Sequence, residues 1–188
     1  MKYTTFVRPT GPIISNIVRP RPVSPIPSRL YNDLHNYMKD MVDKRRFACT
    51  CTGKMHLHQA ITFEDCGSIV PLTYGQNMIR DIDKSIHAEH NAILKLPQRY
   101  SRKLLAINIF VIKTTLSGVV GMSKPCAHCL TIMTTLPQKL GYRIANIFYT
   151  IQSGEIEKKK LSELLSEEMH VSKLFSTNGF KVRPTNTL

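Results

Sequence analysis

Two short motifs constrain this 188-residue chain more than any other feature. The first is His87-Ala-Glu89, and the second, further along the chain, is Pro125-Cys126-Ala-His-Cys129. A histidine and two cysteines suit a single zinc ion, because zinc binds imidazole nitrogen and thiolate sulfur tetrahedrally and a catalytic site keeps one position open for water. The fold must therefore bring both motifs together, with Glu89 beside the ion and not bound to it.

The spacing within each motif fits a reaction centre. Two intervening residues let Cys126 and Cys129 reach one ion from a single helical turn, and Pro125 suits the first turn, where its missing N–H is not needed. The positive end of that helix favours thiolates. Glu89 can take a proton from water at the ion and return it to a reacting group. H-x-E followed by P-C-x-x-C is the pattern of zinc deaminases of nucleobases. Each motif alone would be weak, since P-C-x-x-C also occurs in structural half-sites and redox pairs.

The composition and net charge predict a globular protein that binds anionic partners. Hydrophobic residues make up 42% of the sequence, and no stretch approaches the ~20 apolar residues of a membrane span. Prolines and arginines occupy the N-terminus where a signal peptide needs an apolar run. We therefore expect an intracellular protein, cytoplasmic or nuclear and not secreted. The five cysteines favour metal ligation over disulfides. A formal charge of +13 favours nucleic acid, nucleotide phosphates or an acidic protein as partner.

The chain divides into an arm and one domain. Residues 1–27 are rich in proline and basic residues, which predicts a poorly ordered arm. This arm is either a tether for nucleic acid or another partner, or a solvated tail without one. Residues 28–188 form the catalytic domain.

The pattern along the domain predicts alternating strands and helices. A helix begins at Ser28 and presents an apolar face of Leu30, Leu34, Tyr37, Met38 and Met41. A hairpin covers 58–63 and 68–75, turning at Gly67, with Pro71 marking an edge strand. Helices begin at both motifs, and Pro137 and Gly141 end the second one. The remaining expected elements are buried strands at 104–115 and 144–150, a loop at 117–121, an amphipathic helix at 155–170 and a last short element at 180–182.

Further polar residues are candidates for the site. Asn77, His90 and Asn91 lie near the first motif and are candidates for substrate binding, although His90 could also be a fourth ligand or a packed histidine. His128 is interpreted as a spacer between the cysteines. A possible second metal site combines Cys49, Cys51, His56 and His58, whose residue types suit zinc but whose spacing matches no standard ligand pattern. The alternative is a polar segment with two inert thiols.

The residues from His58 to Thr150 resemble the cytidine and deoxycytidylate deaminase superfamily. The order of hairpin, H-x-E helix, strand, P-C-x-x-C helix and strand is that of the family, and His87-Ala-Glu-His-Asn-Ala-Ile93 looks most like the deoxycytidylate deaminase motif. The resemblance implies a three-layer α/β/α sandwich with a five-stranded mixed sheet, a zinc ion, and contact of Asn77 with the substrate sugar. Tyr74-Gly-Gln-Asn77 departs from the usual Gly-Tyr-Asn-Gly, and the connection 136–142 is longer than is typical.

Three hypotheses follow for the function. The leading one is a zinc-dependent hydrolytic deaminase that converts a cytosine nucleotide, deoxycytidylate, to the uracil form with release of ammonia, acting as a homo-oligomer. The alternative is an editing deaminase acting on cytosine or adenine in tRNA or single-stranded nucleic acid. The charge favours it, whereas the absence of tryptophan leaves few stacking platforms. The third is an inactive zinc-stabilised binding module, against which the intact Glu89 argues.

Overall fold

The computed structural model describes residues 25–45, 56–81, 84–115 and 117–167. The helices and strands, in chain order, are α1 (Ser28–Arg45), β1 (His56–Asp65), β2 (Ile69–Gln76), β3 (Met78–Asp81), β4 (Lys84–Ile86), α2 (Ala88–Leu94), β5 (Leu105–Thr115), β6 (Val120–Gly121), α3 (Ala127–Lys139), β7 (Tyr142–Thr150), β8 (Ile156–Lys160) and α4 (Leu161–Ser166). The predicted arm, Cys49, Cys51 and the element expected at 180–182 lie outside the described residues, apart from the arm's last three positions.

The central sheet is mixed, as predicted. Its strand order is β2-β1-β5-β7-β8, and β6 pairs with the free end of β5. The β5–β7 pair is parallel and the others are antiparallel. The sheet has six strands and not the predicted five.

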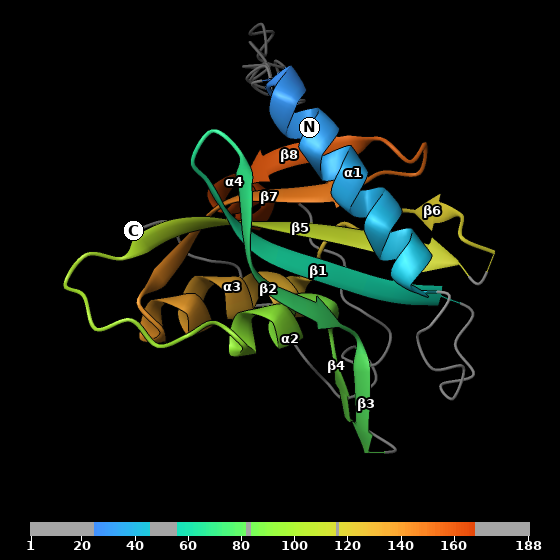
Figure 1. Ribbon diagram of the computed structural model, residues 1–188. Coiled ribbons are helices and arrows are strands. Elements are labelled where there is room, and N and C mark those ends of the chain that lie inside the picture. The colour runs from blue at the N-terminus through green and yellow to red at the C-terminus, as the bar shows by residue number, and fades with distance from the viewer. Residues whose placement is uncertain (1–24, 46–55, 82–83, 116, 168–188) are drawn as a thin grey trace, which may run out of the picture.

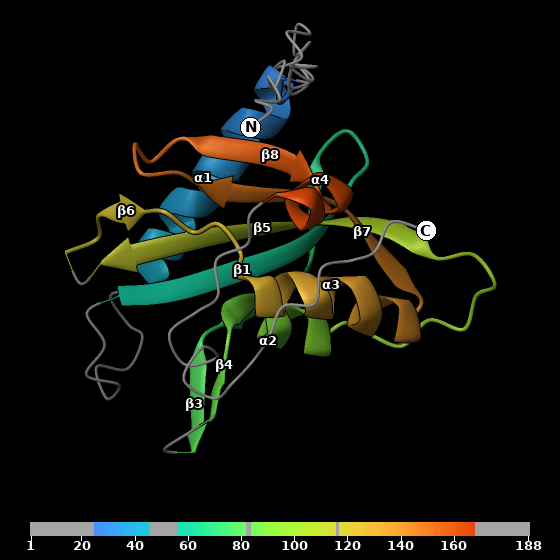
Figure 2. The same ribbon diagram turned by 180° about the vertical axis from the view of Figure 1, so that it is seen from behind.

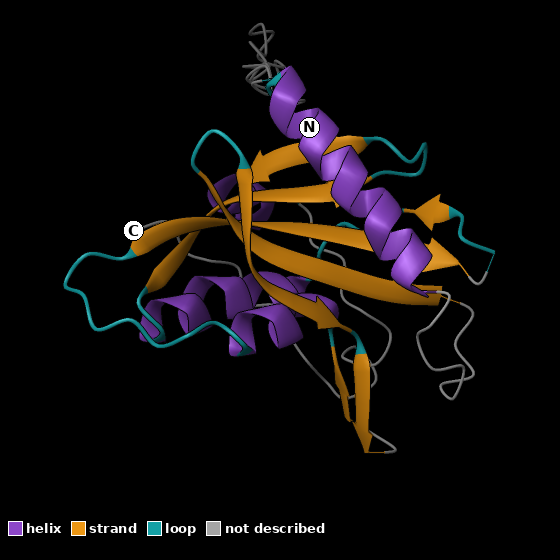
Figure 3. Cartoon of the chain, viewed as in Figure 1, coloured by secondary structure: helices purple, strands orange, loops and turns teal. Residues whose placement is uncertain are grey.

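The three-layer α/β/α arrangement is confirmed (Figures 1 and 3). Helix α1 crosses one face of the sheet, and α2 and α3 lie side by side on the other. The apolar face predicted for the first helix is the one that packs: Leu30, Leu34, Met38 and Met41 are buried in one cluster with Phe63 and other strand residues. Alternating residues of each strand supply the two faces, which follows from the two-residue period of a strand.

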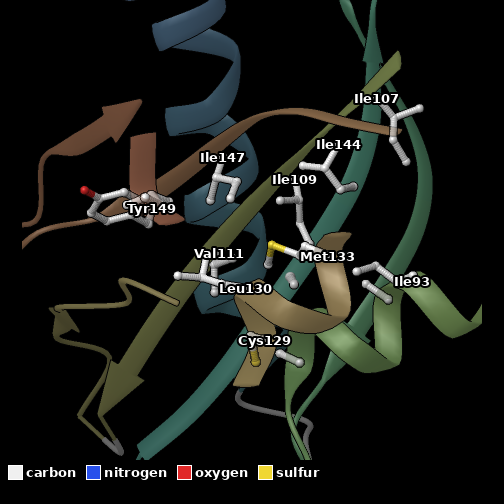
Figure 4. Close-up of a cluster of buried hydrophobic side chains, with 14 of the residues drawn as sticks. Ile93, Ile107, Ile109, Val111, Cys129, Leu130, Met133, Ile144, Ile147 and Tyr149 are labelled. Atoms are coloured by element: carbon white, nitrogen blue, oxygen red, sulfur yellow. The ribbon is translucent and has the colours of Figure 1, made fainter. Parts of the chain in front are cut away.

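The second core lies between the sheet and α2, α3 and α4. Ile107, Ile109 and Val111 of β5 contribute to it from the sheet, and Leu130 and Met133 contribute from α3. Figure 4 shows these side chains converging between β5 and α3, with Cys129 at the end of the cluster where α3 begins. The metal-binding motif of α3 is therefore anchored directly on the hydrophobic core.

The predicted hairpin is confirmed in detail. Strands β1 and β2 pair antiparallel around a turn in which Gly67 has φ of 87°, a conformation that favours glycine. Strand β2 is the edge of the sheet, where Pro71 is tolerated because its missing N–H breaks no ladder in the interior. The register shifts between Thr62 and Phe63, opposite this proline.

The helix predicted at 155–170 is wrong for its first part. Residues 156–160 form strand β8, and only 161–166 are helical within the described chain. Lysine and glutamate favour helix locally, but the free edge of β7 supplies backbone partners from Thr150↔Ile156 to Asn146↔Lys160. Tertiary pairing therefore outweighs local propensity.

Two other boundaries differ from the sequence prediction. Pro137 lies inside α3, which continues to Lys139. Gly141 closes the helix instead, with φ of 88° and its N–H donating to the Gln138 carbonyl at 3.1 Å. The segment after Asn77, for which the sequence pattern predicted no element, forms the β3–β4 hairpin, which projects away from the main sheet (Figure 1). The expected loop at 117–121 ends in the short strand β6.

No helix in the described ranges is long and apolar enough to cross a membrane.

Candidate active site

The predicted metal ligands come together at the N-terminal ends of two neighbouring helices. His87 is the N-cap of α2, Cys126 is the N-cap of α3, and Cys129 lies in the first turn of α3. The ligand atoms of these three residues lie within 4.8 Å of one another. His87 Nδ1 is 3.2 Å from Cys129 Sγ and 3.5 Å from Cys126 Sγ. The cluster can hold a metal ion.

The N-terminal end of α2 is positioned by strand β2. Thr73 donates a hydrogen bond from its hydroxyl to the Ala92 carbonyl at 2.8 Å, and Asn91 donates from Nδ2 to the Gln76 carbonyl at 2.8 Å. Gly75 allows the approach, because a Cβ placed there would lie 2.3 Å from the Ala88 carbonyl oxygen. Helix and strand therefore meet backbone to backbone immediately after His87.

The loop before α3 is fixed from the opposite side. The Ser123 side chain is buried and donates a hydrogen bond to the Val111 carbonyl at 2.7 Å, while it accepts one from the Thr150 N–H at 2.8 Å. The neighbouring Lys124 forms an ion pair with Glu167 at 2.7 Å. These contacts tie the segment leading into Cys126 to the ends of β5 and β7 and to the end of α4.

The two thiols shift each other's pKa in opposite directions. A hydrogen bond from Cys129 lowers the pKa of Cys126 to about 4, against the effect of burial, while the same hydrogen bond and burial raise the pKa of Cys129 well above its ordinary value. A divalent cation at this point can displace the thiol protons and stabilise both thiolates. The donor set of one imidazole and two thiolates fits zinc, and within the described residues it leaves the fourth tetrahedral position without a protein ligand.

Glu89 lies beside the ligands, as its spacing predicted. Its side chain is 4% exposed, and its Oε2 has no hydrogen-bond partner among the described residues. Burial raises the pKa of Glu89, opposed by a backbone hydrogen bond and by the charge of His87. A carboxyl group at this place can accept a proton and release it again.

The candidate substrate-binding residues lie around this centre. Asn77 follows β2, and its Oδ1 accepts a hydrogen bond from the His58 N–H at 2.9 Å. Asn91 is buried, with its amide N–H₂ bound to the carbonyl of Gln76. The ring of His90 lies 6.5 Å from that of His128 in an edge-on arrangement. Contact of Asn77, His90 or Asn91 with a substrate stays a prediction.

His128 is more than a spacer. Its ring lies 6.4 Å from that of His87 and packs edge-on against it as well as against His90. Burial lowers its pKa. Nothing in the motif spacing indicates this contact, which depends on α2 and α3 lying side by side.

Of the four residues of the predicted second metal site, two lie within the described ranges and two lie outside them. Cys49 and Cys51 lie outside the described ranges, whereas His56 and His58 begin strand β1, with ring centroids 5.3 Å apart. Burial lowers the pKa of His58 to about 4, and the charges of His56, Lys113 and His87 act in the same direction. His58 thus belongs to the surroundings of the His87 centre, which the sequence alone does not show.

Comparisons with known proteins find weak structural similarity to solved structures. No protein-family model matches the chain, and no curated protein sequence matches it. Among solved structures, the cytidine deaminase from Mycobacterium leprae is 18% identical with a TM-score of 0.41, covering 69% of this chain and 94% of its own. A mutant cytidine deaminase from Mycobacterium tuberculosis is 16% identical with a TM-score of 0.42, covering 71% of this chain and 95% of its own. The topology of this chain defines a mixed α/β protein, and its candidate site consists of a half-buried histidine and two buried cysteines.

Proposed function

We propose that this protein is a zinc-dependent hydrolytic deaminase that converts a cytosine nucleotide, deoxycytidylate, to the uracil form and releases ammonia. The observation that carries the proposal is the buried Glu89 carboxylate, with an unpartnered oxygen, beside a three-residue ligand cluster. Hydrolytic deamination needs an activated water and a group that moves protons, and this centre offers both.

Zinc held by His87, Cys126 and Cys129 would supply Lewis acidity, which can lower the pKa of water from 15.7 to about 7. Glu89 has the proton-transfer role. Its carboxylate accepts a proton from the attacking water and delivers it to the ring nitrogen. The second proton of the water then passes through Glu89 to the departing amine, so that the C–N bond breaks to ammonia while a C=O bond forms. The raised pKa of Glu89 suits a group that is protonated and deprotonated in each cycle.

The geometry argues against the non-catalytic alternatives. A structural zinc site is closed by four protein ligands, whereas the described residues supply three. A redox pair needs only the two thiols, and it gives no reason for His87 Nδ1 to lie within 3.5 Å of both sulfurs. An inactive zinc module gives no reason for a buried carboxylate without a full set of hydrogen bonds, which is costly to maintain.

The test combines a substrate panel with one isosteric variant. Purified full-length protein is loaded with zinc, and ammonia release is measured with deoxycytidylate, cytidylate, the nucleosides and the corresponding adenine compounds. Glu89→Gln should retain zinc but lose about 10²- to 10⁴-fold in kcat. Glu155→Gln is the matched control, because the Glu155 side chain is exposed and its carboxylate hydrogen bonds with nearby Ser153, far along the chain from the ligand motifs. Ammonia release by none of the substrates, or full activity of Glu89→Gln, would refute the proposal.

The charge of +13 favours a second candidate, a deaminase acting on cytosine or adenine in tRNA or single-stranded nucleic acid. This candidate requires affinity for a polynucleotide that falls steeply with salt, because phosphate contacts release counterions. Binding should also weaken when residues 1–27 are removed. Binding that is absent, or that does not change with salt, excludes this candidate.

A further inference from the structure

Three neighbouring strands place one row of polar residues at the edge of the candidate active site. His58 of β1 and Lys113 of β5 are directly paired in the sheet register. On the other side of His58, Asn77 follows the end of β2 and is held by two hydrogen bonds: its N–H donates to the His58 carbonyl at 3.1 Å, and its Oδ1 accepts from the His58 N–H at 2.9 Å. The row Asn77–His58–Lys113 is thus fixed by backbone pairing.

This row faces the helices that carry the metal ligands. Ala60 and Val111, which pair with each other two residues further along β1 and β5, are buried in the core beneath α2 and α3. His58 and Lys113 occupy the same face, because side chains on one side of a strand recur every two residues. Figures 1 and 2 show β1 and β5 extending beyond the ends of α2 and α3 where the helices begin. The row therefore lies on the part of the sheet that continues past the metal ligands.

His58 is within electrostatic range of the centre itself. The charges of both His87 and Cys126 act on its imidazole. His58 is largely withdrawn from solvent, and a neutral imidazole at this place has one N–H to donate and one nitrogen to accept. Its side chain can therefore hydrogen bond a ligand that is held at the metal centre.

Lys113 supplies a fixed positive charge without a matching carboxylate. It is half-buried, and among the described residues no aspartate or glutamate forms an ion pair with it. Its neighbour in the register on β6 is Gly121, and the Lys113 Cδ lies 3.9 Å from where a Cβ of that glycine would be. The aliphatic part of the Lys113 side chain therefore packs beside the space that this glycine leaves on β6. An anion near the Lys113 ammonium group would therefore meet no competing carboxylate among the described residues.

We propose that His58 and Lys113 form a binding site for a phosphate group of the substrate, with Lys113 supplying the charge and His58 a hydrogen bond. This proposal rests on the proposed deaminase function and names the residues that would distinguish a cytosine nucleotide from the corresponding nucleoside. Charge-assisted hydrogen bonds from lysine are well suited to phosphate oxygens. The remaining neighbours in the row and on its face, Asn77 and His56, add no negative charge that would repel such a group.

The test compares phosphorylated and unphosphorylated substrates of the zinc-loaded, full-length protein. The ratio of kcat/KM for deoxycytidylate to kcat/KM for deoxycytidine should fall about 10- to 100-fold in Lys113→Gln, the effect of losing one charge-assisted contact. His58→Gln should lower the same ratio less. Lys103→Gln is the matched control, because Lys103 is exposed and lies just before β5, at the opposite end of that strand from Lys113. An equal loss with both substrates, or no change in the ratio, would overturn the proposal.

A binding measurement separates this proposal from the deaminase function. Titration calorimetry with deoxycytidylate and with inorganic phosphate does not require turnover. Weaker binding of both by Lys113→Gln than by Lys103→Gln supports the phosphate site even if no ammonia is released, and equal binding by the two variants refutes it. A parallel titration with a short deoxycytidine oligonucleotide distinguishes a phosphodiester from a terminal phosphate: loss of oligonucleotide binding assigns the site to a phosphate within a chain, and loss of deoxycytidylate binding assigns it to a free nucleotide.

Discussion

The close contact between Gly75 and α2 gives a strong prediction about how the site is held together. A Cβ at position 75 would lie 2.3 Å from the Ala88 carbonyl oxygen and 2.4 Å from the Ala92 nitrogen. Real Cβ contacts are essentially never below 3.0 Å, so in Gly75→Ala the strand and helix must separate by about 0.7 Å, the difference between 3.0 and 2.3 Å. Both obstructing atoms are backbone atoms, which have no alternative rotamer.

The expected cost is at the upper end for an overpacked core, about 3 kcal/mol. With a urea dependence of about 2 kcal/mol/M, the unfolding midpoint of Gly75→Ala should fall by about 1.5 M. The value of kcat/KM should also fall, because the separation moves helix α2, which carries His87 at its N-cap and Glu89 in its first turn. A displacement of about 1 Å can lower a rate about 100-fold.

The assay compares urea unfolding of Gly75→Ala with that of Gly121→Ala, and it compares zinc content and kcat/KM of Gly75→Ala with those of the unaltered protein. Gly121 is also in a strand, also lacks a positive φ, and its added Cβ would meet only the flexible Lys113 side chain at 3.9 Å. Gly121→Ala should change stability by less than about 1 kcal/mol. If Gly75→Ala unfolds at the same urea concentration as the control, the close approach of β2 and α2 is not present in solution and the reasoning fails.

Three further predictions concern the supports of the site. Ser123→Ala should lose about 1–3 kcal/mol of unfolding free energy, because the buried partners Val111 and Thr150 lose their hydrogen bonds, and an unchanged thermal midpoint would contradict this. Removal of zinc by a chelator should lower the free energy of unfolding by about 2.7 kcal/mol relative to protein held at about 100 times the dissociation constant, and Cys126→Ser should abolish that difference in urea unfolding. Burial acts to raise the pKa of Glu167, but hydrogen bonds from Lys124 and Lys159 outweigh it and hold the pKa below its ordinary value of 4.5. The stabilisation is therefore present above pH 4.5 and is lost as the pH falls through the lowered pKa. Glu167→Gln should remove a contribution of less than about 1 kcal/mol at about pH 6 and nothing at about pH 2, which unfolding at the two pH values checks.

The residues of the candidate metal site could be predicted from the sequence because their grouping depends largely on local spacing. Two cysteines three positions apart at a helix start reach one point whatever the rest of the chain does, and Glu89 follows His87 into the same cavity by the geometry of a helix N-terminus. The apolar period of α1 and the turn at Gly67 are likewise properties of neighbouring residues. These features were predicted with their residues and appear in the structure.

Only the tertiary structure decided what depends on a partner distant in the sequence. Residues 156–160 have the composition of a helix and become β8 because the edge of β7 offers them backbone partners. The contact of Gly75 with α2, and the ring of His128 against His87, require two elements to lie side by side. The pairing of His58 with Lys113 is set by the register of β1 on β5, and a shift of one residue would turn both side chains to the other face. Local spacing thus determined which residues form the His87–Cys126–Cys129 cluster, and long-range register determined which residues surround it.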